Sequence, residues 1–183
     1  MQDQQLLIKV ISVGDTQSGK SCLIKRFCEG RFINKYVTTI GVDYGVKKMM
    51  IQNKKVAINF FDLSGDEDYK EIRNPFFADA QGVVLVCDLT DRQSFQNLPK
   101  WEKMMTDNGL DLKQAAVYVV GNKSDLKNKE VDSGDILAYA KKKGFEGMIC
   151  SAAGGENVNE VNSNQNCSYL RGCSRRLWIR LKI

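Results

Sequence analysis

The stretch Gly14-Asp15-Thr16-Gln17-Ser18-Gly19-Lys20-Ser21 decides how this chain folds. It fits the pattern G-x-x-x-x-G-K-[ST] and lies between an apolar run, Leu6–Val13, and an amphipathic stretch, Lys20–Glu29. A strand, a glycine-rich loop and a helix in this order let backbone N–H groups surround a phosphate, and the helix N-terminus adds positive potential. We expect Lys20 to place a charge between the β- and γ-phosphates and Ser21 to coordinate magnesium. A chance glycine-lysine turn is the alternative, and the flanking strand and helix argue against it.

Apolar runs and helical patterns alternate along the rest of the chain. The patterns predict strands at Leu6–Val13, Val42–Ile51, Lys55–Asp62, Gly82–Asp88, Ala115–Gly121 and Met148–Ser151, and helices at Lys20–Glu29, Phe95–Met105 and Ile136–Lys143. Two of these strands flank Gln52-Asn53, which is typical of a hairpin. The order predicts an α/β, doubly wound, mostly parallel six-stranded sheet with one antiparallel hairpin strand and helices on both faces. Ligands of such sheets bind at the carboxyl ends of the strands.

The composition is that of one globular domain. The chain has 183 residues, of which 43% are hydrophobic and 27% charged. No apolar run approaches the roughly 18 residues that span a bilayer, and the polar start has no basic segment typical of a signal peptide. We therefore expect an intracellular, cytosolic protein, with the nucleus also possible, whose six cysteines are free thiols. The absence of histidine excludes histidine acid/base catalysis and most imidazole metal sites.

The positive charge of the chain lies in its last 22 residues. Residues 1–161 hold 22 basic and 22 acidic residues, whereas residues 162–183 hold five basic and no acidic ones. We expect a domain at 1–161 and an atypical basic, polar tail at 162–183 that is disordered or mis-spliced; contact of Trp178 with an anionic membrane is the alternative. The tail lacks a C-terminal prenylation signal. We therefore expect no stable membrane anchor, no nucleic-acid partner and a monomer.

A second motif indicates which base is bound. Asn122-Lys123-Ser124-Asp125 follows a predicted strand. The Asp125 carboxylate can accept two hydrogen bonds from the N–H groups of guanine, which adenine lacks, and such a site can reject the wrong base by roughly 10⁴–10⁵. Asn122 and Lys123 would brace the loop, with the Lys123 stem over the base. Taken alone, this motif is a common surface turn. Cys150-Ser151-Ala152 ends the last predicted strand, where the Ala152 N–H can donate to the guanine carbonyl.

These ordered motifs resemble the Ras superfamily of small GTPases, and most of all its Rab-like members. Tyr36–Tyr44 resembles the first switch of that family, Phe61-Asp62-Leu63-Ser64-Gly65 the D-x-x-G of the second, and Gly155–Val161 the start of its last helix. Within it, Ile8–Ser12 and Ile40–Val46 resemble the Rab-like branch whose members carry a J domain. A J domain needs a His-Pro-Asp motif, so residues 1–183 do not contain one.

The resemblance implies roles for individual residues. It implies catalytic roles for Lys20, Thr39, Gly65 and Asp66, and magnesium binding by Ser21, Thr39 and Asp62. It implies nucleotide contacts by Thr16, Gln17, Ser18, Gly19, Lys20, Ser21, Cys22, Phe32, Asn122, Lys123, Asp125, Ser151, Ala152 and Ala153. Loss of the γ-phosphate would release Phe32–Thr39 and Gly65–Asn74. Thr39 and Phe32 are otherwise ordinary residues at a strand edge.

The sequence departs from this family at the hydrolytic position. Asp66 stands where most members have the glutamine that orients the attacking water. An ionised carboxylate is shorter, cannot donate and faces an anionic phosphate, so slow hydrolysis is expected; the alternative is that Asp66 acts as a base. Thr16-Gln17-Ser18 replaces residues that are often glycine and can crowd an incoming arginine finger.

Three functions fit these observations. The first is a switch that binds GTP or GDP with Mg²⁺, hydrolyses GTP slowly, and has effectors, an exchange factor and an activating protein as partners. The second is a nucleotide-binding interaction module that scarcely hydrolyses GTP, which Asp66 favours. The third, an ATP-dependent kinase or ATPase, is opposed by Asn122–Asp125.

Overall fold

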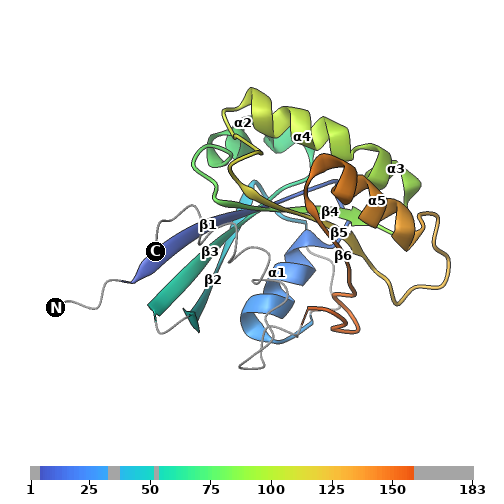
Figure 1. Ribbon diagram of the computed structural model, residues 1–183, viewed down its shortest axis with the longest axis horizontal. Coiled ribbons are helices and arrows are strands. Elements are labelled where there is room, and N and C mark those ends of the chain that lie inside the picture. Colours follow the sequence, from blue (N-terminus) through green and yellow to red (C-terminus); the bar gives the residue numbers. More distant parts are fainter. Residues whose placement is uncertain (1–4, 33–37, 52–53, 159–183) are drawn as a thin grey trace.

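The fold is built around a sheet of six strands with helices on both faces (Figure 1). The computed structural model describes residues 5–32, 38–51 and 54–158. The strands are β1 (Leu6–Val13), β2 (Val42–Ile51), β3 (Lys54–Leu63), β4 (Gly82–Asp88), β5 (Ala116–Asn122) and β6 (Glu146–Ile149). Their order in the sheet is β2-β3-β1-β4-β5-β6, and every neighbouring pair is parallel except β2 and β3. The predicted fold class is confirmed.

The helices form a layer on each side of this sheet. The α-helices are α1 (Lys20–Glu29), α2 (Lys70–Arg73), α3 (Arg92–Gln96), α4 (Leu98–Asp107) and α5 (Ser133–Lys143). Short 3₁₀ turns at Glu67–Tyr69 and Asn74–Phe76 flank α2. Figure 1 shows α1 on one face and α2 to α5 on the other. Among the described residues, no helix is long and apolar enough to cross a membrane.

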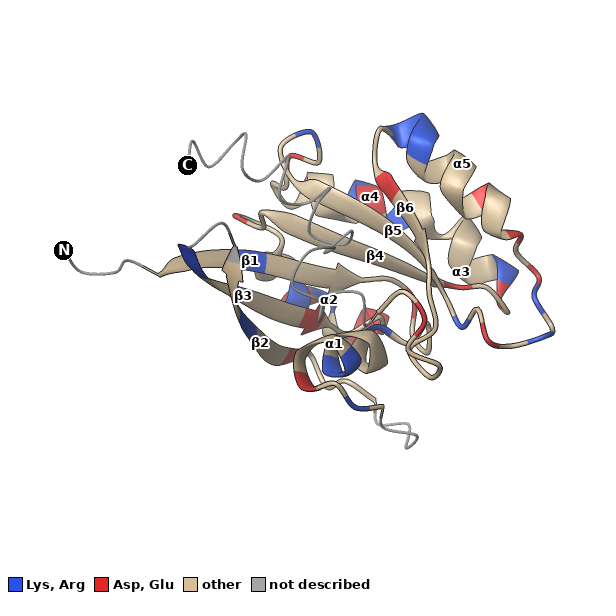
Figure 2. Cartoon of the chain, turned by 60° about the horizontal axis from the view of Figure 1, so that its bottom comes forward, with Lys and Arg blue, Asp and Glu red and all other residues tan. Residues whose placement is uncertain are grey.

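Each face of the sheet has its own apolar core. Alternate side chains of a strand point to opposite faces, so β4 and β5, which are buried along their whole length, supply both cores. One core packs under α3, α4 and α5 and includes Leu85, Trp101 and Met105. The other packs under α1 and includes Leu23, Ile24 and Phe60. Figure 2 shows β4 and β5 almost entirely in the colour of uncharged residues. The one charged residue of these two strands is Asp88, at the end of β4. The cores fix the strand ends at which the polar motifs lie.

Two predicted elements are corrected by the structure. The predicted helix Phe95–Met105 is two helices, α3 and α4, because Pro99 has no N–H to donate to the carbonyl of Phe95. The strand predicted at Met148–Ser151 is β6, which starts and ends two residues earlier; the Ser151 N–H instead donates to the carbonyl of Glu156 at 3.2 Å.

The other differences are small. Helix α5 begins three residues before the predicted Ile136, because the Asp132 carboxylate accepts from the Gly134 N–H at 2.6 Å and caps the helix. Strand β3 begins one residue earlier and ends one residue later than predicted. The predicted turn Gln52-Asn53, the first-switch residues 33–37 and the predicted tail lie outside the described residues.

Candidate nucleotide-binding site

The glycine-rich loop joins β1 to α1 through an unusual backbone path. Gly14, Gln17 and Gly19 have φ angles of 141°, 62° and 87°, in the left-handed region. A Cβ atom on Gly14 would lie 2.1 Å from the carbonyl oxygen of Val86 in β4, and one on Gly19 would lie 2.3 Å from Nδ2 of Asn122. Glycine is therefore required at both positions by conformation and by close contact, which holds the loop against the carboxyl ends of β4 and β5.

Lys20 fills the inside of this loop. Its Nζ donates to the carbonyl oxygens of Gly14 at 2.9 Å and Asp15 at 2.8 Å, and the residue is only 5% exposed. Burial lowers the pKa of Lys20 to about 8, although Asp62 and Asp15 act in the opposite direction. Among the residues that the structure describes, no carboxylate contacts this ammonium group directly, so a bound phosphate would supply the missing negative charge.

Three oxygen-bearing side chains meet at the start of α1. Ser21 Oγ lies 2.9 Å from Oγ1 of Thr39 and donates to Oδ2 of Asp62, which also accepts from Thr39 at 3.4 Å. The other carboxylate oxygen of Asp62, Oδ1, is buried and has no hydrogen-bond partner among the described residues. Burial also raises the pKa of this carboxyl group. Hydroxyl and carboxylate oxygens are the ligands that magnesium prefers, and an unpartnered buried oxygen leaves one of them available. The predicted metal residues thus lie together and fit a magnesium ion.

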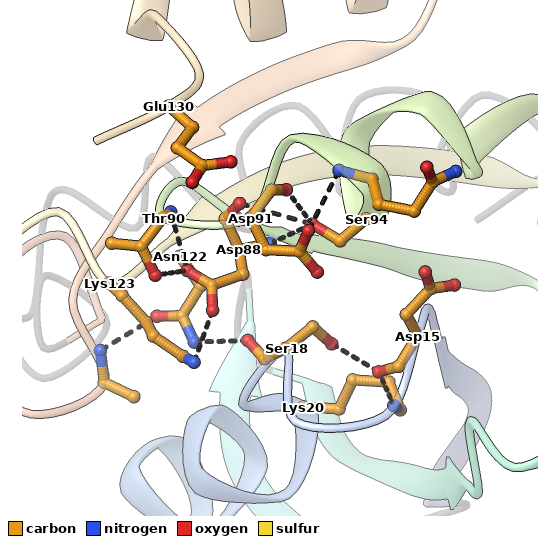
Figure 3. Close-up of polar contacts among 12 residues, drawn as sticks. Asp15, Ser18, Lys20, Asp88, Thr90, Asp91, Ser94, Asn122, Lys123 and Glu130 are labelled. Atoms are coloured by element: carbon orange, nitrogen blue, oxygen red, sulfur yellow. Dashed lines mark hydrogen bonds and ion pairs between the residues drawn. The ribbon is translucent and has the colours of Figure 1, made fainter. Parts of the chain in front are cut away.

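Asn122 ties the phosphate loop to the loop after β6. Its Nδ2 donates to the carbonyl of Ser18 at 2.8 Å, and its Oδ1 accepts from the Ala152 N–H at 3.1 Å (Figure 3). Three segments far apart in the sequence are therefore joined by one buried side chain. In this arrangement the Ala152 N–H has a partner within the protein, and its predicted bond to the guanine carbonyl remains a prediction.

Asp125 lies at the base end of the site, close to Ser151. Oδ1 of Asp125 accepts from Ser151 Oγ at 2.5 Å, and Ser151 Oγ accepts from the Gly154 N–H at 2.7 Å. The hydroxyl therefore occupies one acceptor oxygen of the carboxylate and sets its orientation. Asp125, which is predicted to recognise the base, is thus positioned by Ser151 from the second predicted base-binding motif.

Lys123 makes an ion pair that the sequence did not indicate. Its φ is 64°, and its Nζ contacts Oδ2 of Asp88 at the end of β4. The second oxygen of Asp88 accepts from both the N–H and the hydroxyl of Thr90, each at 2.8 Å (Figure 3). Asp88 and Thr90 hold the Lys123 side chain across the base end. The only signal in the sequence was that Asp88 is a charged residue at the end of a predicted buried strand.

The remaining predicted residues surround these groups. Thr16, Gln17 and Ala153 are exposed, Cys22 is half-buried, and Phe32 packs half-buried against the core under α1. The Cβ position of Gly65 would be 2.4 Å from the Thr16 nitrogen, so Gly65 lies directly against the phosphate loop. The Asp66 carboxylate accepts from the Asp68 N–H at 3.1 Å and thereby caps the following 3₁₀ turn.

Comparison with known proteins decides the family. The model of the Ras family matches residues 9–166. The chain belongs to the Ras family. The Ras-family chain is 42% identical over 162 residues to the DnaJ homolog subfamily C member 27 of Bos taurus, and 41% identical over the same length to the proteins of that name in Danio rerio and Homo sapiens. In each case the match covers 86% of this chain and 59% of the relative. The predicted kinship with the J-domain-bearing Rab-like branch is confirmed. Membership of the family supports GTP binding in general.

Proposed function

We propose that this protein is a guanine-nucleotide switch that binds GTP or GDP together with Mg²⁺ and hydrolyses GTP slowly. One observation supports this proposal. The phosphate loop, the oxygens of Ser21, Thr39 and Asp62, and the Asp125 carboxylate all lie near the carboxyl ends of the parallel strands. When bound, magnesium would neutralise phosphate charge there. Effectors, an exchange factor and an activating protein are its proposed partners.

Different residues would bind the phosphate end and the base end of the nucleotide. Lys20 and the loop N–H groups would hold the phosphates, since the buried ammonium contacts carbonyl oxygens and no carboxylate in the described part of the chain. Asp125, oriented by Ser151, would accept from the N–H groups of guanine. Asn122 keeps both ends at a fixed separation through its bonds to Ser18 and Ala152.

The position of Asp66 supports slow hydrolysis. Its carboxylate already accepts the Asp68 N–H, and its own N–H donates to Ser64 Oγ at 3.3 Å. Because one oxygen of this carboxylate is held as a cap, the group is less free to turn toward a water molecule, and its other oxygen would meet an anionic phosphate. The same observation favours the second candidate function, an interaction module that binds GTP and scarcely hydrolyses it.

Single-turnover hydrolysis of γ-labelled GTP separates these two functions. A Ras-type protein with its glutamine hydrolyses GTP at roughly 3–5 × 10⁻⁴ s⁻¹ without an activator. We expect the wild-type rate to fall below this value and to rise in Asp66→Gln, because glutamine reaches further and carries no charge.

Two controls isolate the cause of the change. Asp66→Asn removes the charge and retains a capping oxygen, so it separates repulsion from reach. Asp68→Gln removes an exposed carboxylate from the same turn and should leave the rate unchanged. A wild-type rate at or above that of Asp66→Gln would show that Asp66 is a competent catalytic residue. No detectable turnover by the wild type would favour the interaction module.

A further inference from the structure

The segment Gly65–Asn74, which the family resemblance identifies as the second switch, contains a fully buried arginine. Arg73, the last residue of α2, has no exposed surface, and its Nη1 donates to the carbonyl oxygens of Ser64 at 3.1 Å and Asp66 at 2.5 Å. These two carbonyls flank Gly65 on both sides in the sequence. A single cationic group therefore fixes the backbone of Ser64–Asp66 from inside the protein.

The surroundings of Arg73 hold the guanidinium in place. It lies 4.8 Å from the centre of the Trp101 ring, and Nη2 lies 3.2 Å from Oε2 of Glu67 and 3.4 Å from Sδ of Met104. Glu67 is 52% exposed and also pairs with Lys100. Burial of a cation is unfavourable unless hydrogen bonds and an aromatic face replace water. Here both are present at Nη1 and Nη2, whereas Nε is buried without a partner among the described residues.

The same tryptophan connects Arg73 to the phosphate loop. Trp101 Nε1 donates to Oδ1 of Asp15 at 2.7 Å, and Asn97 Nδ2 donates to the other carboxylate oxygen at 2.6 Å. On the opposite side, Gly65 lies against the backbone of residues 14–16, with no room for a Cβ atom. The phosphate loop thus contacts the second switch directly at Gly65 and is linked to it again through Trp101 and Arg73.

We propose that Arg73 is a positioning residue of the γ-phosphate site, which holds the Ser64–Asp66 backbone against the phosphate loop whether or not a γ-phosphate is bound. The proposal rests on the proposed function, because it concerns how the second switch responds to GTP and GDP. The proposal departs from the release of Gly65–Asn74 that the family resemblance implies: the order of this segment would depend only weakly on which nucleotide is bound. Without Arg73, the γ-phosphate would become its main source of order.

Amide hydrogen exchange tests this consequence in the full chain. The readout is exchange at Asp66, Asp68 and Tyr69, whose N–H groups are hydrogen-bonded in this turn, with MgGDP and with a non-hydrolysable GTP analogue. We expect wild-type exchange to be similar in the two states. In Arg73→Met, exchange in the GDP state should rise about ten- to a hundredfold, as expected from losing hydrogen bonds to a charged group. The rise with the GTP analogue should be clearly smaller.

Matched variants separate positioning from a general effect on stability. Lys70→Met removes an exposed basic residue from the same helix and should leave exchange unchanged. Arg73→Lys retains the charge but cannot bridge two carbonyls and stack on Trp101 together, so it should raise exchange in the GDP state by an intermediate amount. If Arg73→Met does not fold, Arg73→Lys carries the same comparison.

Two results would overturn the proposal. One is unchanged exchange in the GDP state of the Arg73 variants. The other is an equal rise in both nucleotide states and in the amides of β5, which would mean that Arg73 serves only global stability. Titration of labelled GDP and GTP on the same preparations shows whether nucleotide binds at all. If neither nucleotide binds, the proposed function fails. Amide exchange in the nucleotide-free wild type and Arg73→Lys would then still show whether Arg73 orders the Ser64–Asp66 backbone.

Discussion

The base end of the site and the second switch are held in different ways. At the base end, Asn122 is the last residue of β5 and Ser151 lies two residues after β6. Their side chains make short hydrogen bonds to backbone or to Asp125. The second switch lies in a longer connection between β3 and β4, and a buried cation anchors it from below. The sheet therefore positions the proposed binding contacts, whereas Asp66, the residue proposed to control hydrolysis, depends on a separate support. Binding and turnover can then change independently.

The largest effect is expected at the base end. Asp125→Asn replaces a double acceptor by a group with one acceptor and one donor side, so the affinity for GDP should fall by on the order of 10²–10⁴-fold, since each hydrogen bond to a charged group contributes about 1.5–3 kcal/mol. The variant should gain affinity for XDP, whose extra carbonyl matches the amide donor. Titrations with labelled GDP and XDP measure both changes.

The control for this prediction is Asp107→Asn, which removes an exposed carboxylate at the end of α4. It should bind GDP like the wild type. If Asp125→Asn lost affinity for GDP and XDP equally, the carboxylate would be supporting the loop rather than recognising the base.

A smaller effect is expected at the metal residues. Ser21→Ala removes one of the hydroxyls beside Asp62, so GDP should dissociate about ten- to a hundredfold faster, the change expected for losing one contact to a charged group. EDTA should accelerate release from the wild type by a similar factor. The GDP off-rate, followed by exchange of a fluorescent analogue, gives both values.

Combining the two changes sharpens this test. EDTA should have little further effect on Ser21→Ala, because the variant already holds the metal poorly. Thr106→Ala, which removes a hydroxyl from the exposed side of α4, should behave like the wild type. An off-rate of the wild type that does not respond to chelation would count against a bound metal.

The sequence predicts the parts of this molecule in which the chemistry is local. The phosphate loop depends on glycines and a lysine within eight residues, and buried strands appear as apolar runs, so both could be placed without a structure. Pro99 in the sequence also pointed to the break between α3 and α4. The apolar spacing of Phe95, Leu98 and Trp101 nevertheless suggested one continuous helix. In the structure, the missing N–H of Pro99 ends α3 despite the helical spacing of the apolar residues.

The unpredicted contacts join residues that only the fold brings together. Lys123 meets Asp88 across 35 positions, and Trp101 meets Asp15 across 86. Arg73 lies in a short helix without an apolar pattern. Its main partners are backbone carbonyls, and because every residue has one, the sequence does not indicate these contacts. A charged side chain in such a segment is expected at the surface, and its burial follows from the approach of Trp101 and Met104.

Recognition of guanine by this site is tested by a competition titration. Labelled GDP is bound to the wild-type protein with Mg²⁺ and displaced by unlabelled GDP or ATP. Because adenine would leave the Asp125 carboxylate without its donors, we expect ATP to compete at least about 10⁴-fold more weakly than GDP. Equal competition by ATP and GDP would contradict the account.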